Sequence, residues 1–310
     1  MFDLYTIQQL REKMPLFDTR RPSRYFPEMI EYLTHFGMLS DLFEHHYGYV
    51  RTTGYSIFLN AFVPPKPRGT VLFNHGLYDH IGSCWPFISR LLEEEFLVLA
   101  YDFPGHGLSS GDKYCIADFS EYASVMKDIL AETGRYWKKP YHTVSFSTGV
   151  SCFLEYFRRH SLDWFDKVAL VGPLIRSYMW EPSRMIYKVF GGSFNVIPVP
   201  KLPSHVSSDI DFQRRQLRDP LMEWKLPPCW FGALLKWNER IADIPISDKE
   251  VLVIQGGRDK VVDYKFNLPF LQTRFPRMTL KMFPESKHAI LNEMPGIRES
   301  AFQAILDYIS

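Results

Sequence analysis

The residues most able to do chemistry lie around Ser147, in the segment Ser145-Phe146-Ser147-Thr148-Gly149. A serine flanked by small residues where a strand passes into a helix is typical of a nucleophile elbow, a tight turn that exposes the hydroxyl. Ser147 has Ser145 two positions before it and Gly149 two positions after it, so S-x-S-x-G replaces the usual G-x-S-x-G. Ser145 has no glycine beside it and is the weaker alternative nucleophile. The segment also fits a strand–helix junction whose small residues only permit close packing.

Two residues far downstream in the sequence, an aspartate and a histidine, are the partners that a serine nucleophile needs. Asp259 follows an apolar run in VLVIQGGRDKVVD, and His288 follows a later one in FPESKHAILNE. A histidine takes the serine proton, and a buried carboxylate orients the imidazole and stabilises its charged form. The chain order Ser, Asp, His is the order that follows a nucleophile elbow. The pattern therefore predicts a triad of Ser147, Asp259 and His288, with Asp263 as the rival acid.

The elements that must position these residues alternate between short apolar runs and longer amphipathic stretches. Strands are expected at 49–53, 56–63, 70–74, 96–101, 142–146, 167–171, 250–255 and 279–283, and helices at 85–95, 116–136, 149–160, 264–274 and 296–309. This alternation predicts an α/β protein with a mostly parallel sheet and helices on both faces. Ligands of such sheets bind beyond the carboxyl ends of the strands, where all three triad residues fall.

Two segments depart from this alternation. Residues 1–47 show helical spacing and are expected to form an N-terminal helical extension, with His45 and His46 in a solvated turn. Residues 173–248 are expected to form a helical cap insertion, which leaves 48–172 and 249–310 as the core. The insertion holds four tryptophans and several methionines, which either form a small core of their own or line an acyl pocket.

The segments NHGLYDH, LAYDFPGHGLSSG, SFSTG, GGRDKVVD and HAILNE together resemble the α/β-hydrolase superfamily. More narrowly, they resemble its monoacylglycerol lipase, lysophospholipase and serine aminopeptidase-like branch, over residues 49–310. The resemblance implies that Ser147 is the nucleophile, Asp259 the acid and His288 the base. It also implies an oxyanion hole made by the backbone N–H groups of Leu77 and Thr148, and a structural role for the D-x-x-G-H-G turn that begins at Asp102.

The sequence therefore predicts an esterase or lipase-type serine hydrolase that acts through an acyl-enzyme on an ester or lipid with an apolar acyl chain. A peptidase or amidase of the same fold is one alternative; it would need a carboxylate for the substrate's amine, for which Glu181, Glu223 and Asp219 are candidates. A non-catalytic binding protein is another, although such proteins usually lose a triad member.

No cofactor is expected, and no metal. His75, Asp79 and His80 are metal-ligand types, but their spacing suits a turn after a strand.

The composition narrows the class of protein. The 310 residues carry a net charge of +1, which argues against a nucleic-acid partner. The longest stretch without a charged residue, 140–154, is too short and too polar to span a bilayer, so at most peripheral membrane contact is expected. The N-terminus lacks a signal-peptide pattern, and four cysteines without C-x-x-C spacing predict buried free thiols of a reducing compartment, the cytoplasm.

Overall fold

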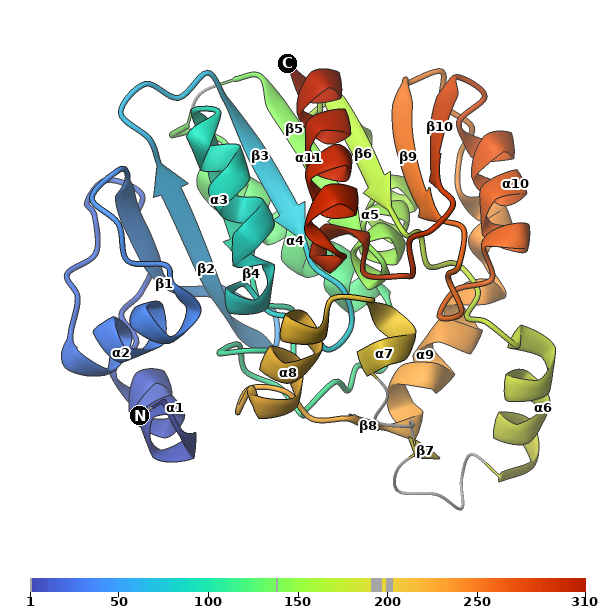
Figure 1. The fold of residues 1–310 in the computed structure, drawn as a ribbon, viewed down its shortest axis with the longest axis horizontal. Coiled ribbons are helices and arrows are strands. Elements are labelled where there is room, and N and C mark those ends of the chain that lie inside the picture. Colours follow the sequence, from blue (N-terminus) through green and yellow to red (C-terminus); the bar gives the residue numbers. More distant parts are fainter. Residues whose placement is uncertain (1, 138, 191–196, 199–202) are drawn as a thin grey trace.

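The computed structural model describes residues 2–137, 139–190, 197–198 and 203–310. An eight-stranded sheet crosses the molecule (Figure 1). Its strands lie in the order β1 (Glu44–Thr52), β2 (Tyr55–Val63), β4 (Phe96–Tyr101), β3 (Gly69–Asn74), β5 (Tyr141–Phe146), β6 (Lys167–Val171), β9 (Val251–Gly256) and β10 (Met278–Phe283). Strand β2 is antiparallel to both of its neighbours, and every other adjacent pair is parallel. The predicted mostly parallel sheet is confirmed.

Helices cover both faces of this sheet because its central strands are apolar on both sides. Helices α3 (Trp85–Glu93) and α11 (Pro295–Ile309) lie on the near face in Figure 1, whereas α4 (Ser120–Thr133) and α5 (Thr148–Arg159) lie behind it. Helix α10 (Tyr264–Arg274) lies beside the β9–β10 edge.

One predicted helix is shorter than expected. The segment 116–136 becomes helical only at Ser120, because the Glu121 carboxylate folds back to accept the N–H groups of Ala117 and Asp118 at 2.9 and 3.0 Å. These bonds close the turn ahead of α4, so the chain before Ser120 cannot continue the helix.

The N-terminal segment packs against the near face of the sheet. It holds α1 (Leu4–Lys13) and α2 (Pro27–Phe36), whose apolar faces join the same buried cluster as residues of α3 and α11. Arg11 donates a hydrogen bond to the carbonyl oxygen of Gly107 at 2.8 Å. This contact fastens α1 to the glycine-rich turn that follows β4.

The solvated turn expected at His45 and His46 is wrong, because β1 begins at Glu44 and buries both side chains. His45 stacks on Phe62 with ring centroids 4.6 Å apart, and its Nε2 lies 2.8 Å from Asn60 Oδ1. Burial lowers the pKa of His45 to about 4, so the ring is neutral and packs as an aromatic side chain.

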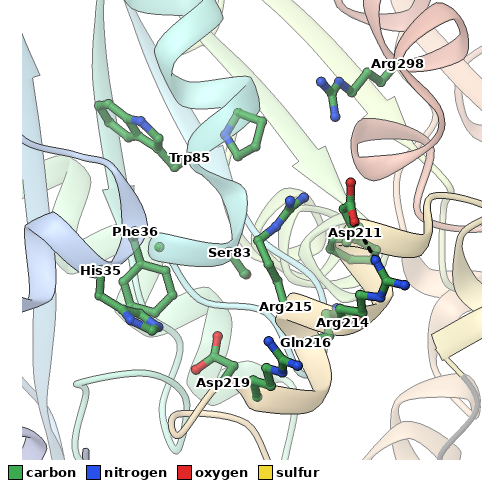
Figure 2. Close-up of a pocket in the computed structure, with 14 residues that line it drawn as sticks. His35, Phe36, Ser83, Trp85, Asp211, Arg214, Arg215, Gln216, Asp219 and Arg298 are labelled. Atoms are coloured by element: carbon green, nitrogen blue, oxygen red, sulfur yellow. Dashed lines mark hydrogen bonds and ion pairs between the residues drawn. The ribbon is translucent and has the colours of Figure 1, made fainter. Parts of the chain in front are cut away.

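The cap lies across the carboxyl ends of the strands (Figure 1). Its elements are α6 (Trp180–Phe190), β7 (Ile197–Pro198), α7 (Pro203–Val206), α8 (Ile210–Arg218), β8 (Lys225–Leu226) and α9 (Pro228–Asn238). Short 3₁₀ turns at Gly82–Cys84, Ile241–Asp243 and Ile290–Asn292 complete the described secondary structure. A cavity opens between α8, α2 and the start of α3 (Figure 2).

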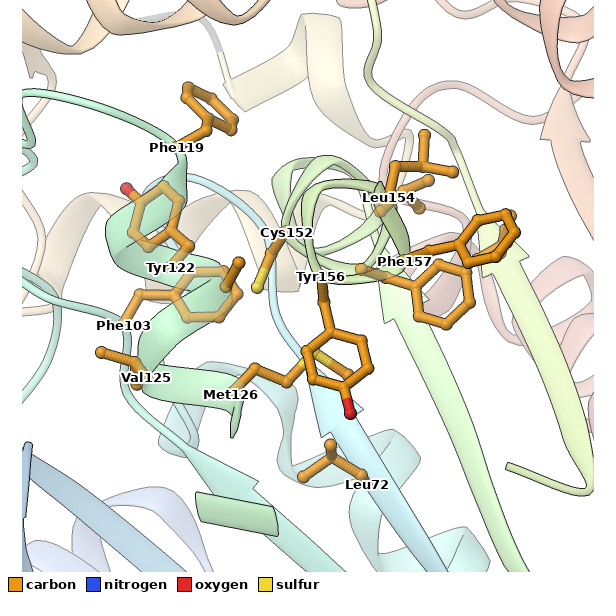
Figure 3. Close-up of a cluster of buried hydrophobic side chains, with 14 of the residues drawn as sticks. Leu72, Phe103, Phe119, Tyr122, Val125, Met126, Cys152, Leu154, Tyr156 and Phe157 are labelled. Atoms are coloured by element: carbon orange, nitrogen blue, oxygen red, sulfur yellow. The ribbon is translucent and has the colours of Figure 1, made fainter. Parts of the chain in front are cut away.

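Tryptophans of the cap extend the core formed by α4 and α5, which Figure 3 shows around Phe103, Tyr122 and Cys152. Trp237 is fully buried and stacks on Phe119, and its Nε1 donates to the Glu155 carboxylate at 3.2 Å. Trp180 and Trp230 are buried in the same cluster as Trp237. Three of the four cap tryptophans are therefore packing residues, but they join the main core and do not form a separate core of the cap.

The prediction of four free thiols is wrong for two of them. Cys115, ahead of α4, and Cys229, on α9, form a disulfide, whereas Cys84 and Cys152 are free and buried. The bonded residues are 114 positions apart, and only the folding of the cap onto the core brings their Cα atoms to 5.6 Å. Spacing along the chain carries no signal for such a pair.

None of the helices among the described residues is long and apolar enough to cross a bilayer.

Candidate active site

The turn that carries Ser147 is a strained junction between β5 and α5. Ser147 is the single residue between the two elements. Its backbone has φ 52° and ψ −113°, a conformation that residues other than glycine rarely adopt. Its N–H donates to the carbonyl oxygen of Val171 on β6 at 2.9 Å. A Cβ at Gly149 would lie only 2.3 Å from the carbonyl oxygen of Asn74. Close packing of α5 on β3 therefore requires the glycine that the sequence places after the serine.

The structure brings the three predicted triad residues together. His288, in the loop after β10, has its Nε2 at 2.8 Å from Ser147 Oγ and its Nδ1 at 2.8 Å from Asp259 Oδ2. All three side chains are buried. An ionised carboxylate can only accept, so Nδ1 carries the proton and Nε2 is left to accept the serine hydroxyl. This arrangement suits proton transfer from Ser147 to His288.

The Asp259 carboxylate is held in its ionised form. Its Oδ2 also accepts from Gln255 Nε2 at 3.0 Å, and its Oδ1 accepts the N–H groups of Val261 and Val262. Burial alone would raise the pKa of Asp259, but the charge and hydrogen bond of His288, with the other donors, outweigh it and lower that pKa. Sequence reasoning missed Gln255, a residue of β9, because only the turn after β9 brings the Asp259 carboxylate back to it.

The two alternative residues occupy structural positions. Ser145 is fully buried within β5, where its Oγ accepts a hydrogen bond from Asn74 Nδ2 at 3.0 Å. Asp263 is the N-cap of α10, and its side chain accepts the N–H of Phe266. Among the described residues, the His288 ring hydrogen-bonds Asp259 and Ser147 and not these two.

The two N–H groups predicted to form the oxyanion hole donate no hydrogen bond to any described residue. Thr148 is the first residue of α5, so its N–H has no acceptor within the helix, and no described residue accepts from the N–H of Leu77. A tight turn follows Leu77, with Tyr78 at φ 69° and the Asp79 N–H bonded to the carbonyl oxygen of Gly76. Two backbone donors and a helix N-terminus are thus available for a developing negative charge.

The loop after β3 is fastened from behind by Asp102, as the structural role expected for its turn requires. Asp102 accepts the N–H groups of Ile81 and Leu108, each at 2.8 Å, so one carboxylate joins the two loops. His75 accepts the Phe103 N–H on Nε2 at 2.9 Å, and burial lowers its pKa to about 3. His75 therefore acts as a neutral structural group.

His80 joins this loop to the cap. Its Nε2 lies 2.8 Å from Asp219 Oδ2, just past the end of α8, and both side chains are buried. Burial lowers the pKa of His80, but the Asp219 carboxylate more than offsets this and raises it; the same pair lowers the pKa of Asp219 against its own burial. The pair, 139 residues apart, is a link that sequence reasoning missed.

The loop of His288 is also tied to the cap. The Ala289 N–H donates to the carbonyl oxygen of Val206 at 2.8 Å, and Ser207 Oγ donates to that of Asn292 at 2.7 Å. The cap therefore contacts the loops that carry both the histidine and the predicted oxyanion donor, and its position is coupled to theirs.

Two of the three carboxylates suggested for binding a substrate amine are engaged elsewhere. Asp219 pairs with His80, and Glu181 pairs with Arg184 in an exposed contact on α6. Glu223 is exposed, and its N–H donates to the Tyr114 hydroxyl. Among the described residues, no group of three acidic, histidine or cysteine side chains is arranged to hold a metal ion.

The strand order, the strained serine turn and the helical cap define a protein of the α/β-hydrolase fold. A family model described as "Serine aminopeptidase, S33" matches residues 65–295, and the chain belongs to this hydrolase family.

Relatives and solved structures agree with this assignment. The chain is 24% identical over 248 residues to the monoglyceride lipase homolog of Monkeypox virus, covering 78% of this chain and 90% of that protein. It is 23% identical to the monoglyceride lipase of Mus musculus, covering 84% and 89%. A soluble variant of the Saccharomyces cerevisiae monoglyceride lipase superposes with a TM-score of 0.73 at 17% identity, over 84% of this chain and 94% of that one. At that identity the superposition shows the fold.

Replacement of Asp219 tests the link between His80 and the cap. Because the pKa of His80 is raised in the folded state, the pair's stabilisation is complete below the ordinary histidine value of ~6.5 and is lost as pH rises through the folded value. Because the pKa of Asp219 is lowered, the stabilisation is lost again only in acid. We expect Asp219→Asn to reduce the loss of stability between pH 6 and pH 8.5, measured as the free energy of unfolding in urea.

Asp211→Asn is the matched control, since Asp211 forms an exposed ion pair with Arg214 on the same helix. It should keep the wild-type pH dependence. An Asp219→Asn protein with the same dependence as wild type would show that the pair is not coupled to folding.

Proposed function

We propose that this protein is a lipase/esterase-type serine hydrolase that cleaves carboxylic esters with an apolar acyl chain. The single observation that carries the proposal is the position of His288 between the other two side chains. Its Nε2 lies 2.8 Å from Ser147 Oγ, its Nδ1 lies 2.8 Å from Asp259 Oδ2, and the serine stands on a strained turn. A buried histidine held between a hydroxyl and a carboxylate is the arrangement that activates a serine nucleophile.

The geometry supports a two-stage reaction. His288 Nε2 takes the hydroxyl proton as Ser147 Oγ attacks the ester carbonyl carbon, and the N–H groups of Leu77 and Thr148 stabilise the oxyanion. The tetrahedral intermediate expels the alcohol, which receives the proton from His288, and leaves an acyl group on Ser147. Water then loses a proton to His288 and attacks the acyl-enzyme; the acyl–Oγ bond breaks, His288 returns the proton to Ser147 Oγ, and the carboxylic acid leaves.

Aromatic side chains beside the oxyanion loop support an apolar acyl chain. Trp224 of the cap stacks on Tyr78, with ring centroids 5.6 Å apart, and Tyr78 packs edge-on against Tyr114. Trp224 is the cap tryptophan left outside the buried core cluster, and it lies next to the residue that follows Leu77. The relatives named as monoglyceride lipases favour a glycerol monoester as the substrate.

Exposed apolar residues on α6 support peripheral contact with a lipid surface. Met185, Ile186 and Val189 are exposed by 66%, 59% and 69%. Adjacent apolar side chains on one helix of a cap would favour substrate that is held at an interface. Nucleic acid and cofactors have no part in this proposal.

A cytoplasmic location stays a prediction. The free buried thiols of Cys84 and Cys152 agree with it, whereas a Cys115–Cys229 disulfide is more typical of an oxidising compartment.

An aminopeptidase or amidase is the second candidate, because the matching family carries the description "Serine aminopeptidase". The engagement of Asp219 and Glu181 by other residues weighs against it, since it leaves the exposed Glu223 as the remaining carboxylate to hold a substrate amine.

The first prediction concerns the nucleophile. Ser147→Ala removes the attacking oxygen, so hydrolysis of a chromogenic ester should fall by up to about 10⁶-fold, with loss of labelling by a fluorophosphonate. Ser145→Ala is the matched control; it should keep labelling, because Ser145 lies inside β5 and bonds Asn74. Labelling that survives in Ser147→Ala and disappears in Ser145→Ala would move the nucleophile by two positions.

The second prediction separates the two aspartates. Asp259→Asn deprives His288 of its orienting carboxylate and should lower kcat by a factor on the order of 10⁴. Asp263→Asn keeps a side-chain oxygen that can cap α10 in the same way, so both kcat and stability should stay close to wild type. Steady-state kinetics and urea unfolding on both variants measure these effects, and the opposite ranking of kcat values would assign the acid role to Asp263.

The third prediction concerns the substrate. Each buried methylene is worth ~0.8 kcal/mol, so lengthening the acyl chain by four carbons should raise kcat/KM by roughly two orders of magnitude. A series of glycerol or nitrophenyl esters, kept below their micelle concentrations, should show kcat/KM climbing from acetyl to medium chains and then levelling off. If acetyl esters are the best esters and aminoacyl amides are cleaved faster still, the aminopeptidase candidate replaces the esterase.

A further inference from the structure

A cavity of about 760 Å³ without a role in this chemistry lies between the cap and the near face of the core. Its walls come from α2, from the turn at Gly82–Cys84 with the start of α3, from α8 and from the first turn of α11. Figure 2 shows Arg215 extending from α8 toward the start of α3, and Arg298 extending from α11 into the same opening. All its lining residues are among those described.

The cavity carries positive charge that its own acidic residues do not balance. Four arginines line it: Arg214, Arg215, Arg218 and Arg298. Two of them are paired, Arg214 with Asp211 at 3.2 Å and Arg298 with Asp209 at 3.6 Å.

The other two arginines, Arg215 and Arg218, form no ion pair with any described residue. They are three positions apart on α8, so their side chains leave the same side of the helix. The remaining acidic lining residue, Asp219, is engaged by His80. Two uncompensated guanidinium groups therefore border one cavity.

A buried amide group points to a missing hydrogen-bond partner. Gln216 lines the cavity, is 7% exposed, and its Oε1 has no partner among the described residues. Leaving such a group unsatisfied costs about 1–3 kcal/mol, so buried amides normally have a partner. The oxygen itself is covered by the protein, so the group that can meet a ligand at the cavity wall is the amide NH₂, which donates to anionic oxygens.

The opposite wall adds a third source of positive potential and an apolar surface. The cavity is lined by Ser83, Trp85 and Pro86, at the N-terminus of α3, where the helix dipole favours anions. Phe36 and Trp85 supply aromatic surface. The volume exceeds that of a single small anion and lies within the ~300–1,000 Å³ of ligand pockets, which leaves room for an organic portion.

We propose that this cavity binds the phosphate group of an organic phosphate monoester, with Arg215 and Arg218 pairing with the phosphate oxygens and Gln216 donating to one of them. A guanidinium group donates two parallel hydrogen bonds to a pair of phosphate oxygens. Two neighbouring arginines therefore suit a phosphate better than a single carboxylate, which has fewer acceptor oxygens. The ligand is either a soluble phosphate ester or the headgroup of a single-chain lipid; both present the same monoester. This proposal does not depend on the proposed hydrolase activity.

Isothermal titration at low ionic strength tests it, with glycerol 3-phosphate as the soluble probe and glycerol as the uncharged reference. Wild type should bind one glycerol 3-phosphate per chain saturably and should not bind glycerol. The double variant Arg215→Gln/Arg218→Gln should raise the dissociation constant at least tenfold. Arg159→Gln, which changes an exposed arginine on α5 outside the cavity, should leave it unchanged.

A second variant keeps the test decisive if the double variant fails to fold. Gln216→Glu preserves the shape of the side chain but adds a negative charge, so it should abolish phosphate binding while the circular dichroism spectrum stays native. Absence of saturable binding to wild type, or equal affinity in wild type and a folded variant, overturns the proposal.

A lipid arm distinguishes the two sources of the phosphate. Lysophosphatidate, titrated below its micelle concentration, should bind more tightly than glycerol 3-phosphate if the ligand is a lipid, because its chain would add apolar contact. Equal affinities support a soluble phosphate ester, and in both cases the binding must fall in the Arg215→Gln/Arg218→Gln protein. Each readout is a binding isotherm, so an inactive triad would leave the result intact.

Discussion

The strained turn at Ser147 is the constraint on which the site depends. A residue held at φ 52° costs of order 1–3 kcal/mol, and such strain persists only where the surroundings over-determine it. Here β5 lies between β3 and β6, its residues are fully buried, and the serine N–H is bonded to β6. The absence of a side chain at Gly149 lets α5 start against β3, so the nucleophile and a donor N–H leave the sheet from one fixed point.

Around this point the structure compensates its buried charges individually. The Asp259 carboxylate accepts hydrogen bonds from His288 and from backbone N–H groups, and the Asp219 carboxylate pairs with His80. Asp102 forms no ion pair with the residues that the structure describes, but it accepts two backbone N–H groups, and burial raises its pKa. Removing one partner of such a pair leaves a buried group unsatisfied, which costs far more than the pair is worth in water. These contacts therefore fix the loops relative to one another.

The cap takes part in the same network. Asp219 reaches the oxyanion loop, and Val206 and Ser207 hold the loop of His288. Asp219 also lines the arginine-rich cavity, where Arg215 and Arg218 of α8 have no acidic partner among the described residues. Helix α8 is thus followed directly by Asp219, whose carboxylate binds His80 of the core. The same helix carries Arg215 and Arg218, whose guanidinium groups border the cavity. The contrast distinguishes a structural contact from a candidate binding surface on the same element.

Local patterns in the sequence determined the strands, the main helices and the order of the candidate triad. Apolar runs of five or six residues are buried on both faces because helices cover both sides, and the loops that follow those strands meet at one edge of a parallel sheet. Gly149 could be recognised because a tight turn depends on residues next to the serine. The order Ser, Asp, His could be recognised because each of these residues follows a local apolar run.

Only the tertiary structure decided the pairings between distant segments. It placed Asp259 rather than Asp263 against His288, joined Cys115 to Cys229, and set His80 against Asp219. It also buried His45 within β1 and Trp237 against α4. Periodicity and spacing report what a side chain's own helix, strand or turn does. Which residues face one another across more than a hundred positions depends on how the cap folds onto the sheet, and no local pattern encodes that docking.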